Sequence, residues 1–167
     1  MWMGGDVMQY RIKLNVAKCV GCGGCVAACI DQNDTPVAAG APTRRRVETR
    51  ERMTEHGLRV DYLSLACTHC GRCIPVCPQG CLRRDDDTGF VVFDSLSCVG
   101  CGACAAACPS KSAAVFQGRI TKCDGCWLRV KHGYEPACVR GCITGALHLE
   151  QVSSGADSPV KNKSETR

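Results

Sequence analysis

Aromatic side chains are scarce in this chain of 167 residues, where Phe, Trp and Tyr together make up 5%. Aromatic residues dominate the apolar area that a folded domain buries, so the sequence excludes a large conventional core. The length leaves room for one compact domain or two small ones. Much of the interior must therefore be filled by something other than large apolar side chains.

Long apolar runs are missing as well, because no segment approaches the roughly 18 apolar residues of a membrane-spanning helix. The N-terminal stretch Met1–Met8 lacks the continuous apolar region of an export signal, and Arg11 and Lys13 interrupt the next segment. We therefore expect no direct membrane insertion. No nucleophile–base constellation, phosphate loop or open-coordinate metal motif is visible either, so the chain is predicted not to be catalytic alone.

Cysteine, by contrast, is abundant, and sixteen of the seventeen cysteines fall into four runs. The first three runs share the spacing C-x2-C-x2-C-x3-C; the fourth opens with C-x2-C and closes with C-x3-C after eleven intervening residues. The runs are Cys19, Cys22, Cys25, Cys29; Cys67, Cys70, Cys73, Cys77; Cys98, Cys101, Cys104, Cys108; and Cys123, Cys126, Cys138, Cys142. This spacing is the bacterial arrangement that holds cubane clusters, so the sixteen thiolates are predicted to bind four 4Fe-4S clusters.

Disulfides and zinc are the two competing interpretations of so many cysteines. A disulfide scaffold is disfavoured because the number of cysteines is odd, no signal peptide is recognisable, and cysteines two residues apart in triplets are poorly placed to pair locally. Structural zinc sites use pairs of cysteines rather than repeated triplets with a trailing fourth. Iron–sulfur clusters are the favoured interpretation.

The trailing cysteine of each run suggests how the runs pair, because in two-cluster ferredoxins it ligates the other cluster. Pro78 and Pro109 follow the trailing cysteines of the second and third runs, so these runs are predicted to form one module and the outer runs to pair by exclusion. Each predicted site is named after its leading run. The first-run site is Cys19, Cys22, Cys25 and Cys142; the second-run site is Cys67, Cys70, Cys73 and Cys108; the third-run site is Cys98, Cys101, Cys104 and Cys77; and the fourth-run site is Cys123, Cys126, Cys138 and Cys29.

The predicted fold is α+β: two nested bacterial-ferredoxin-like two-cluster modules with short helices and β-hairpins. The outer module takes residues 1–65 and 115–150, the central module takes 66–114, and 151–167 form a polar tail. Strands are predicted at 10–16, 89–94 and 118–121, a hairpin at 44–65, a short helix at Ala27 and Ala28, and a loop at 31–43. The basic run 44–46 is expected to be a solvated edge or a contact for an acidic partner.

The net charge of +5 is compatible with nucleic-acid binding, but the negative charge of the predicted clusters argues against it. An oxidised 4Fe-4S core with four thiolates carries about −2, so four of them bring the loaded chain from +5 to about −3. The basic residues then balance cluster charge, and no nucleic-acid partner is expected. Because exposed clusters are easily oxidised, the expected location is the cytoplasm, unless a partner that bears an export signal carries the chain elsewhere.

Several residues near the runs have two open interpretations. Cys81, outside the runs, is expected to be a small buried residue or a substitute ligand during assembly or oxidative damage. His69 is expected to pack beside a cluster, or to tune it by a hydrogen bond or proton uptake. Trp127 is expected to pack near a cluster or to meet a partner. His56, His132 and His148 have no pairing spacing and are treated as surface or packing residues.

The chain resembles the four-cluster iron–sulfur subunit of the dimethyl sulfoxide reductase family of molybdenum and tungsten enzymes, over roughly residues 10–150. The resemblance rests on all four runs, on Cys67-Thr-His-Cys70, and on Lys122-Cys123-Asp-Gly-Cys126 followed by Glu135-Pro-Ala-Cys138. It implies an electron wire between a catalytic molybdenum or tungsten subunit and a second redox partner, such as a further electron-transfer or flavin subunit. It also implies the nested cross-ligation given above.

Two departures distinguish the chain from many members of that family. The interval Cys70-Gly-Arg-Cys73 is short, and no C-terminal extension of the kind that docks a membrane anchor is present in the sequence. Both features favour a compact complex, such as a tungsten aldehyde oxidoreductase or a formate-linked system. The alternatives are a free polyferredoxin that shuttles electrons between enzymes, an iron–sulfur sensor or assembly protein, and self-stacking of copies into a longer conductor.

Overall fold

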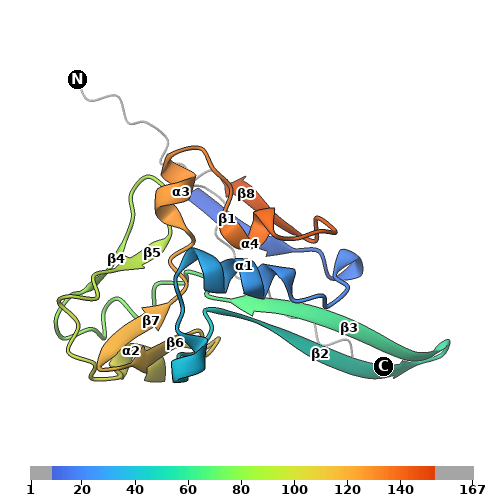
Figure 1. Ribbon diagram of the computed structural model, residues 1–167, viewed down its shortest axis with the longest axis horizontal. Helices are drawn as coiled ribbons and strands as arrows, with labels where there is room; N and C mark the ends of the chain where they lie inside the picture. The colour runs from blue at the N-terminus through green and yellow to red at the C-terminus, as the bar shows by residue number, and fades with distance from the viewer. Residues whose placement is uncertain (1–8, 153–167) are drawn as a thin grey trace.

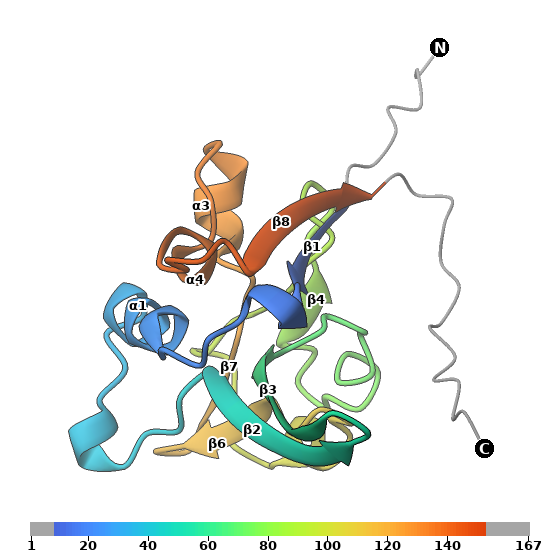
Figure 2. The same ribbon diagram turned by 90° about the vertical axis from the view of Figure 1, so that its right-hand side faces the viewer.

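The computed structural model describes residues 9–152, which form short helices and four two-stranded antiparallel sheets. The described chain begins with β1 (Gln9–Leu14) and ends with β8 (Leu147–Val152), and these two strands pair, with Gln9 opposite Val152 and Leu14 opposite Leu147. Figure 2 shows them side by side at one edge of the molecule. The two ends of the described chain are therefore held together.

The segments inside this pair alternate between cysteine loops, helices and hairpins. After β1 come η1 (Val16–Lys18), α1 (Gly24–Gln32) and η2 (Val37–Ala39), and before β8 come α3 (Trp127–Lys131) and α4 (Ala137–Arg140). Between them lie β4 (Leu82–Arg84), β5 (Val91–Phe93), α2 (Ala103–Ala106), β6 (Ala113–Phe116) and β7 (Arg119–Lys122). Strand β4 pairs with β5, β6 pairs with β7, and α1 packs against α4.

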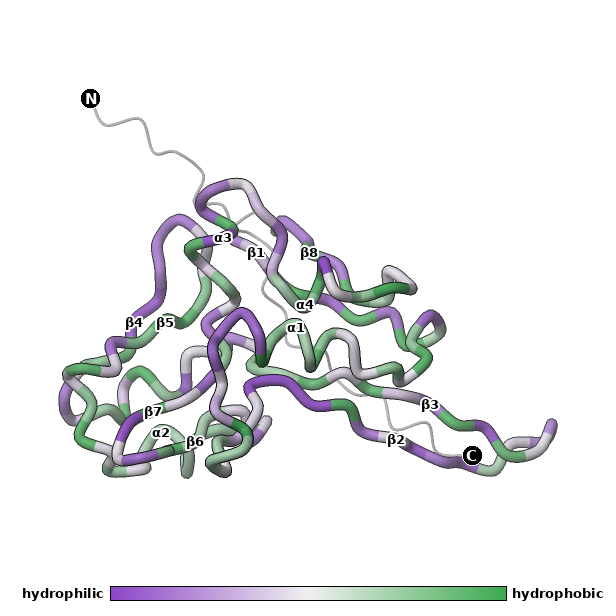
Figure 3. The backbone as a smooth tube through the Cα atoms, in the orientation of Figure 1, coloured by the Kyte–Doolittle hydropathy of each residue, from purple (hydrophilic) through white to green (hydrophobic). Residues whose placement is uncertain are grey.

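The predicted hairpin is confirmed as β2 (Arg45–Thr54) and β3 (Gly57–Ala66), which pair along their whole length. The hairpin extends beyond the rest of the molecule (Figure 1), and hydrophilic residues predominate along β2 (Figure 3). Its tip exposes Met53 and Leu58, whereas Ser64, near its base, is buried. The base of the hairpin is thus part of the interior, and its tip is exposed to solvent.

The interior consists of two small groups of buried residues in which cysteine is prominent. One group is Cys73, Cys81, Leu82, Val91, Cys104 and Ile120. The other is Cys25, Cys138, Val139 and Leu147. Within residues 9–152 no large aromatic core joins them, in agreement with the low aromatic content.

Two expectations about secondary structure need correction. The segment 31–43 is not all loop, because α1 continues to Gln32 and η2 follows it. Residues 151 and 152 belong to β8 rather than to a polar tail; the rest of that tail, from 153, and Met1–Met8 lie outside the described residues. Within residues 9–152 no helix is long and apolar enough to span a membrane.

The basic run 44–46 is not a solvated edge, which is a further correction. Arg45 is only 4% exposed, and the side chain of Arg44 donates to Asn33 Oδ1 at 2.7 Å. Arg46 donates to Glu48 Oε1 at 2.8 Å and remains partly exposed. The base of the hairpin packs against α1, and this contact buries charged side chains that the sequence pattern predicts to be solvent-exposed.

Candidate metal centres

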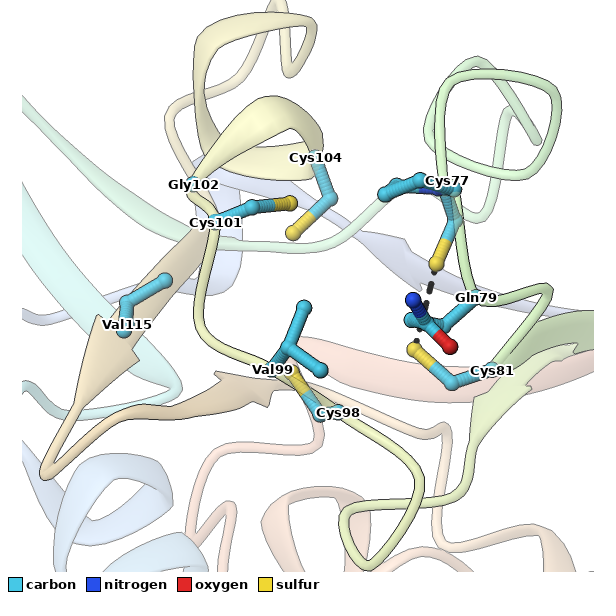
Figure 4. A pocket seen from close by; sticks show the side chains of 10 residues that line it. Cys77, Gln79, Cys81, Cys98, Val99, Cys101, Gly102, Cys104 and Val115 are labelled. Carbon is cyan, nitrogen blue, oxygen red and sulfur yellow. Dashed lines mark hydrogen bonds between the residues drawn. The ribbon is translucent and has the colours of Figure 1, made fainter.

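Three cavities gather cysteines in the combinations that the trailing-cysteine rule predicts. Each is lined by three cysteines of one run and the trailing cysteine of another. The combinations are Cys98, Cys101 and Cys104 with Cys77; Cys67, Cys70 and Cys73 with Cys108; and Cys19, Cys22 and Cys25 with Cys142. Figure 4 shows the first of these, with the sulfur atoms turned into the cavity.

The fourth predicted set also comes together, on α1, α4 and the loop before α3. Burial, together with the smaller effect of the nearby thiolates of Cys123, Cys138 and Cys126, raises the pKa of the Cys29 thiol to about 12. Burial likewise raises the pKa of Cys126 to about 11. These electrostatic interactions among the four thiols indicate that they lie near one another.

Hydrogen bonds to sulfur favour the thiolate form of two trailing cysteines, Cys108 and Cys142. Burial opposes ionisation of Cys108, but the Ser110 hydroxyl and the backbone N–H of Ser112, 3.3 Å from Sγ, lower the pKa of the thiol. Burial is outweighed in the same way at Cys142, whose pKa is lowered by the N–H of Leu147 at 3.4 Å and by the Thr144 hydroxyl. Metal-binding cysteines are thiolates, so these bonds prepare the residues for iron.

Two buried cations provide an independent test of whether an anionic group fits. Lys122 is 1% exposed, and its Nζ donates to the carbonyl oxygens of Val91 and Cys123, each at 2.6 Å. Arg45 donates through Nη1 to the hydroxyl of Ser64 at 3.0 Å. Among residues 9–152 neither cation forms an ion pair with a carboxylate.

An unpaired buried cation costs several kcal/mol, so a compensating negative charge is needed close by. Lys122 lines the second-run cavity and lies beside Cys123, and it lowers the pKa of Cys67 against the larger effect of burial. Arg45 acts in the same way on Cys138. Clusters with four thiolates carry net negative charge, so the donor sets, the cavities and the cations together fit 4Fe-4S groups.

Single metal ions fit less well than clusters. Across the part of the chain that the structure describes, no three His, Cys, Asp or Glu side chains converge on a position for one ion. Each of the three cavities instead has at least four cysteine sulfurs distributed around it, which is the ligand set of a group that has several metal atoms. The geometry thus favours polynuclear clusters over mononuclear zinc.

His69 occupies a junction between two of the sites. Its backbone lies in the second-run loop, whereas its side chain reaches the fourth run, with Nε2 3.9 Å from Cys123 Sγ. Trp127 is flanked by cations instead, with Lys131 Nζ 4.7 Å and Arg83 Cζ 5.9 Å from the ring centroid. His56 is exposed at the hairpin tip, in agreement with the expectation of a surface residue.

Arg45 and Lys122 were not identified from the sequence, although strand periodicity carries a signal for each. Lys122 shares a face of β7 with buried Ile120, two residues earlier, and Arg45 shares a face of β2 with half-buried Val47. A cation on the inward face of a strand beside a cysteine run indicates charge compensation. Cys81 was expected to be buried, and its 8% exposure confirms this.

Comparison with known proteins gives a consistent result. Two family models match, both described as a 4Fe-4S dicluster domain, over residues 58–152 and 18–81. Similar proteins include an anaerobic dimethyl sulfoxide reductase chain of Escherichia coli strain K12, 36% identical over 152 residues that cover 83% of this chain and 72% of the relative. Another is YnfG of the same strain, named as a probable chain of such a reductase and 34% identical, with 84% and 73% covered. A tetrathionate reductase subunit of Salmonella typhimurium is 34% identical, with 83% and 56% covered.

Proposed function

Because the chain belongs to the 4Fe-4S dicluster family of iron–sulfur subunits, we propose that it carries four such clusters and relays electrons between a molybdenum or tungsten catalytic subunit and a second redox partner. It is an electron-transfer subunit of an oxidoreductase complex and is not catalytic alone. When bound, each cluster supplies one-electron redox chemistry. The protein supplies thiolate ligands, hydrogen bonds to sulfur and buried positive charge.

The observation that carries the proposal is the exchange of trailing cysteines between runs. Cys77 lines the third-run cavity and Cys108 lines the second-run cavity, so each cavity has its fourth thiol from the opposite run. Cys142 does the same for the first-run cavity, and Cys29 is close to the fourth-run thiols. These placements support the four ligand sets and the nesting of a central module inside an outer one.

The pairing of β1 with β8 and the packing of α1 on α4 further support the nested layout. The first contact joins strands that flank the outer runs, and the second joins helices that carry Cys25, Cys29 and Cys138 of those runs. In this layout the second- and third-run sites share the central module, and the first- and fourth-run sites share the outer one. In this layout His69 reaches from the central module to the outer one, and we propose that the clusters of both modules form one electron path.

Iron and sulfide quantification on anaerobically prepared protein tests the cluster count. About sixteen iron atoms per chain are expected for four cubanes, and zinc, disulfides or far fewer irons would refute the proposal. The pairing is tested by Cys108→Ala, which should damage the second-run cluster; loss confined to the third-run cluster would contradict cross-ligation. Cys81→Ala is the matched control, because Cys81 belongs to none of the four sets.

The partners are tested on the native complex. We expect a stable assembly that contains molybdenum or tungsten, with a further electron-transfer or flavin subunit, and located in the cytoplasm. A monomeric red-brown protein that reduces several enzymes would favour the polyferredoxin alternative. Stacking of copies is tested by the dependence of particle mass on protein concentration.

A further inference from the structure

The residue four positions after Cys77 is a second thiol, and the backbone holds it in a defined place. Between them the Gly80 N–H donates to the Cys77 carbonyl oxygen at 3.2 Å, with Gly80 in the left-handed region at φ +60°. The Cys81 carbonyl oxygen then accepts from the Asp94 N–H at 2.9 Å. This turn brings Cys81 back beside Cys77.

The fourth run has the same turn without the second thiol. The Gly145 N–H donates to the Cys142 carbonyl oxygen at 3.0 Å, and Gly145 has φ +63°. The Ala146 carbonyl oxygen accepts from the Asn15 N–H at 2.8 Å. The two turns therefore share these two backbone hydrogen bonds, and Cys81 in one takes the place of Ala146 in the other.

In the remaining runs, this position supports the trailing cysteine but does not offer a sulfur. Ser112 donates its backbone N–H to Cys108 Sγ at 3.3 Å. Asn33 places Nδ2 3.6 Å from Cys29 Sγ. Of the four runs, only the second has a cysteine at this position. A thiolate is the ligand that the iron atoms of a 4Fe-4S cluster prefer.

The Cys81 side chain faces the third-run cavity. Its Sγ lies 3.2 Å from Cys77 Sγ, and it lines the cavity together with Cys98, Cys101 and Cys104. Figure 4 shows the Cys77 and Cys81 sulfurs on the same side of the cavity, joined by the dashed contact. Five thiols thus surround a space whose predicted occupant needs four.

We propose that Cys81 is a reserve ligand of the third-run site, able to replace Cys77 at the fourth iron corner. This rests on the proposed four-cluster function. In the exchange the iron–sulfur bond to Cys77 breaks, one to Cys81 forms, and the proton of the Cys81 thiol passes to the released Cys77 sulfur. No electron is gained or lost, so no oxidant or reductant is required. The cluster is retained when Cys77 is damaged or removed.

The test measures iron in anaerobically prepared full-length variants. Cys77→Ala should keep about sixteen irons, whereas the double variant Cys77→Ala/Cys81→Ala should fall to about twelve. Cys142→Ala is the matched control, because Ala146 offers no replacement, and it should also fall to about twelve. In Cys77→Ala a redox titration followed by electron paramagnetic resonance should show one cluster with a shifted potential and the others unchanged.

A gain-of-function variant gives a second test that does not depend on Cys77→Ala folding. Cys142→Ala/Ala146→Cys should recover the irons that Cys142→Ala loses, because the two turns match, and Ala146→Cys alone should change nothing. Equal iron losses in Cys77→Ala and Cys142→Ala would overturn the reserve role. Full retention in Cys77→Ala/Cys81→Ala would overturn it too. Failure of the four-cluster proposal would appear in the unsubstituted chain, so the two failures are distinguishable.

Discussion

The imidazole Nε2 of His69 lies 3.9 Å from the Sγ of Cys123, although the two residues belong to different predicted cluster sites. The other ring nitrogen, Nδ1, accepts the backbone N–H of Val91 at 3.0 Å. Because an acceptor nitrogen carries no hydrogen in the neutral ring, the proton is on Nε2 and points toward sulfur. Burial lowers the pKa of His69 to about 3, so the ring is neutral. His69 therefore donates from the second-run loop to a fourth-run thiolate.

Replacing His69 by Phe should lower the reduction potential of the fourth-run cluster. Hydrogen bonds to cluster sulfurs set the potential, and they stabilise the more negative, reduced form. Loss of this one bond should shift the midpoint by some tens of millivolts, where about 59 mV corresponds to a tenfold change for one electron. Redox titration monitored by electron paramagnetic resonance measures the shift.

His56→Phe is the matched control for this change, because the His56 side chain is 89% exposed at the tip of the β2–β3 hairpin, outside the four cysteine runs. Its spectrum and potentials should match those of the unsubstituted protein. An unchanged fourth-run potential in His69→Phe, with iron content intact, would show that the contact with Cys123 does not act on the cluster.

Arg45 should raise the potential of the cluster beside it through its charge. Burial raises the pKa of Cys138, and the Arg45 guanidinium opposes that rise by favouring the thiolate. The same cation should favour the reduced, more negative cluster. Arg45→Gln is therefore expected to lower the fourth-run potential by tens of millivolts or more, measured by the same titration.

Arg46→Gln separates this effect from a general loss of positive charge. Arg46 is adjacent in sequence, remains partly exposed and pairs with Glu48, so solvent and salt screen its charge. The Arg46→Gln substitution should leave the reduction potentials of all clusters nearly unchanged, and its small effect should disappear at high ionic strength. Equal shifts from the two substitutions would contradict a specific role for the buried cation.

Asp85 fixes the turn that leads to β5 and should be a main determinant of stability. The carboxylate is 2% exposed and accepts from the Thr88 N–H at 3.0 Å, the Thr88 hydroxyl at 2.7 Å and Lys131 Nζ at 2.9 Å. Asp85→Asn should lower the free energy of unfolding by about 1–3 kcal/mol. Asp87→Asn, on the same lysine but with a side chain 71% exposed, should cost within about 0.5 kcal/mol.

The Asp85 effect should also depend on pH. Burial raises the pKa of its carboxyl, but the hydrogen bonds from Lys131 and Thr88 outweigh burial and lower it below the usual 3.8. A lowered folded-state pKa means that the stabilisation is fully present above the unfolded value and is lost as the pH falls through the folded value. Chemical unfolding of Asp85→Asn and the unsubstituted chain should converge at acid pH, whereas a constant difference would exclude ionisation as the cause.

Cysteine spacing predicts much of the site, because each run is local and the trailing-cysteine rule reaches across runs. The grouping of Cys108 with Cys67 is an example, and the cavity geometry agrees with it. The hairpin was also predictable from its turn and alternation. The burial of Arg45 and Lys122 was not predictable. A charged residue is expected on the solvent-exposed surface unless the anion that compensates its charge is known. Nor could spacing show that His69 meets Cys123, 54 residues away, because that contact depends on how the second-run loop packs against the fourth run.

Gly125 should tolerate no side chain, because it combines a left-handed backbone with a close aromatic neighbour. It has φ +75°, and a Cβ atom would overlap the ring of buried Phe90. Gly23 has the same φ with nothing within 4 Å of its Cβ position, so it isolates the backbone cost. Alanine should cost about 1–2 kcal/mol at Gly23 and a further 1–3 kcal/mol or so at Gly125 from overpacking. Since Gly125 lies between Cys123 and Cys126, its Ala variant should also lose iron from the fourth-run site first. Thermal unfolding and iron release under a chelator measure both effects, and equal costs at the two glycines would show that Phe90 moves aside.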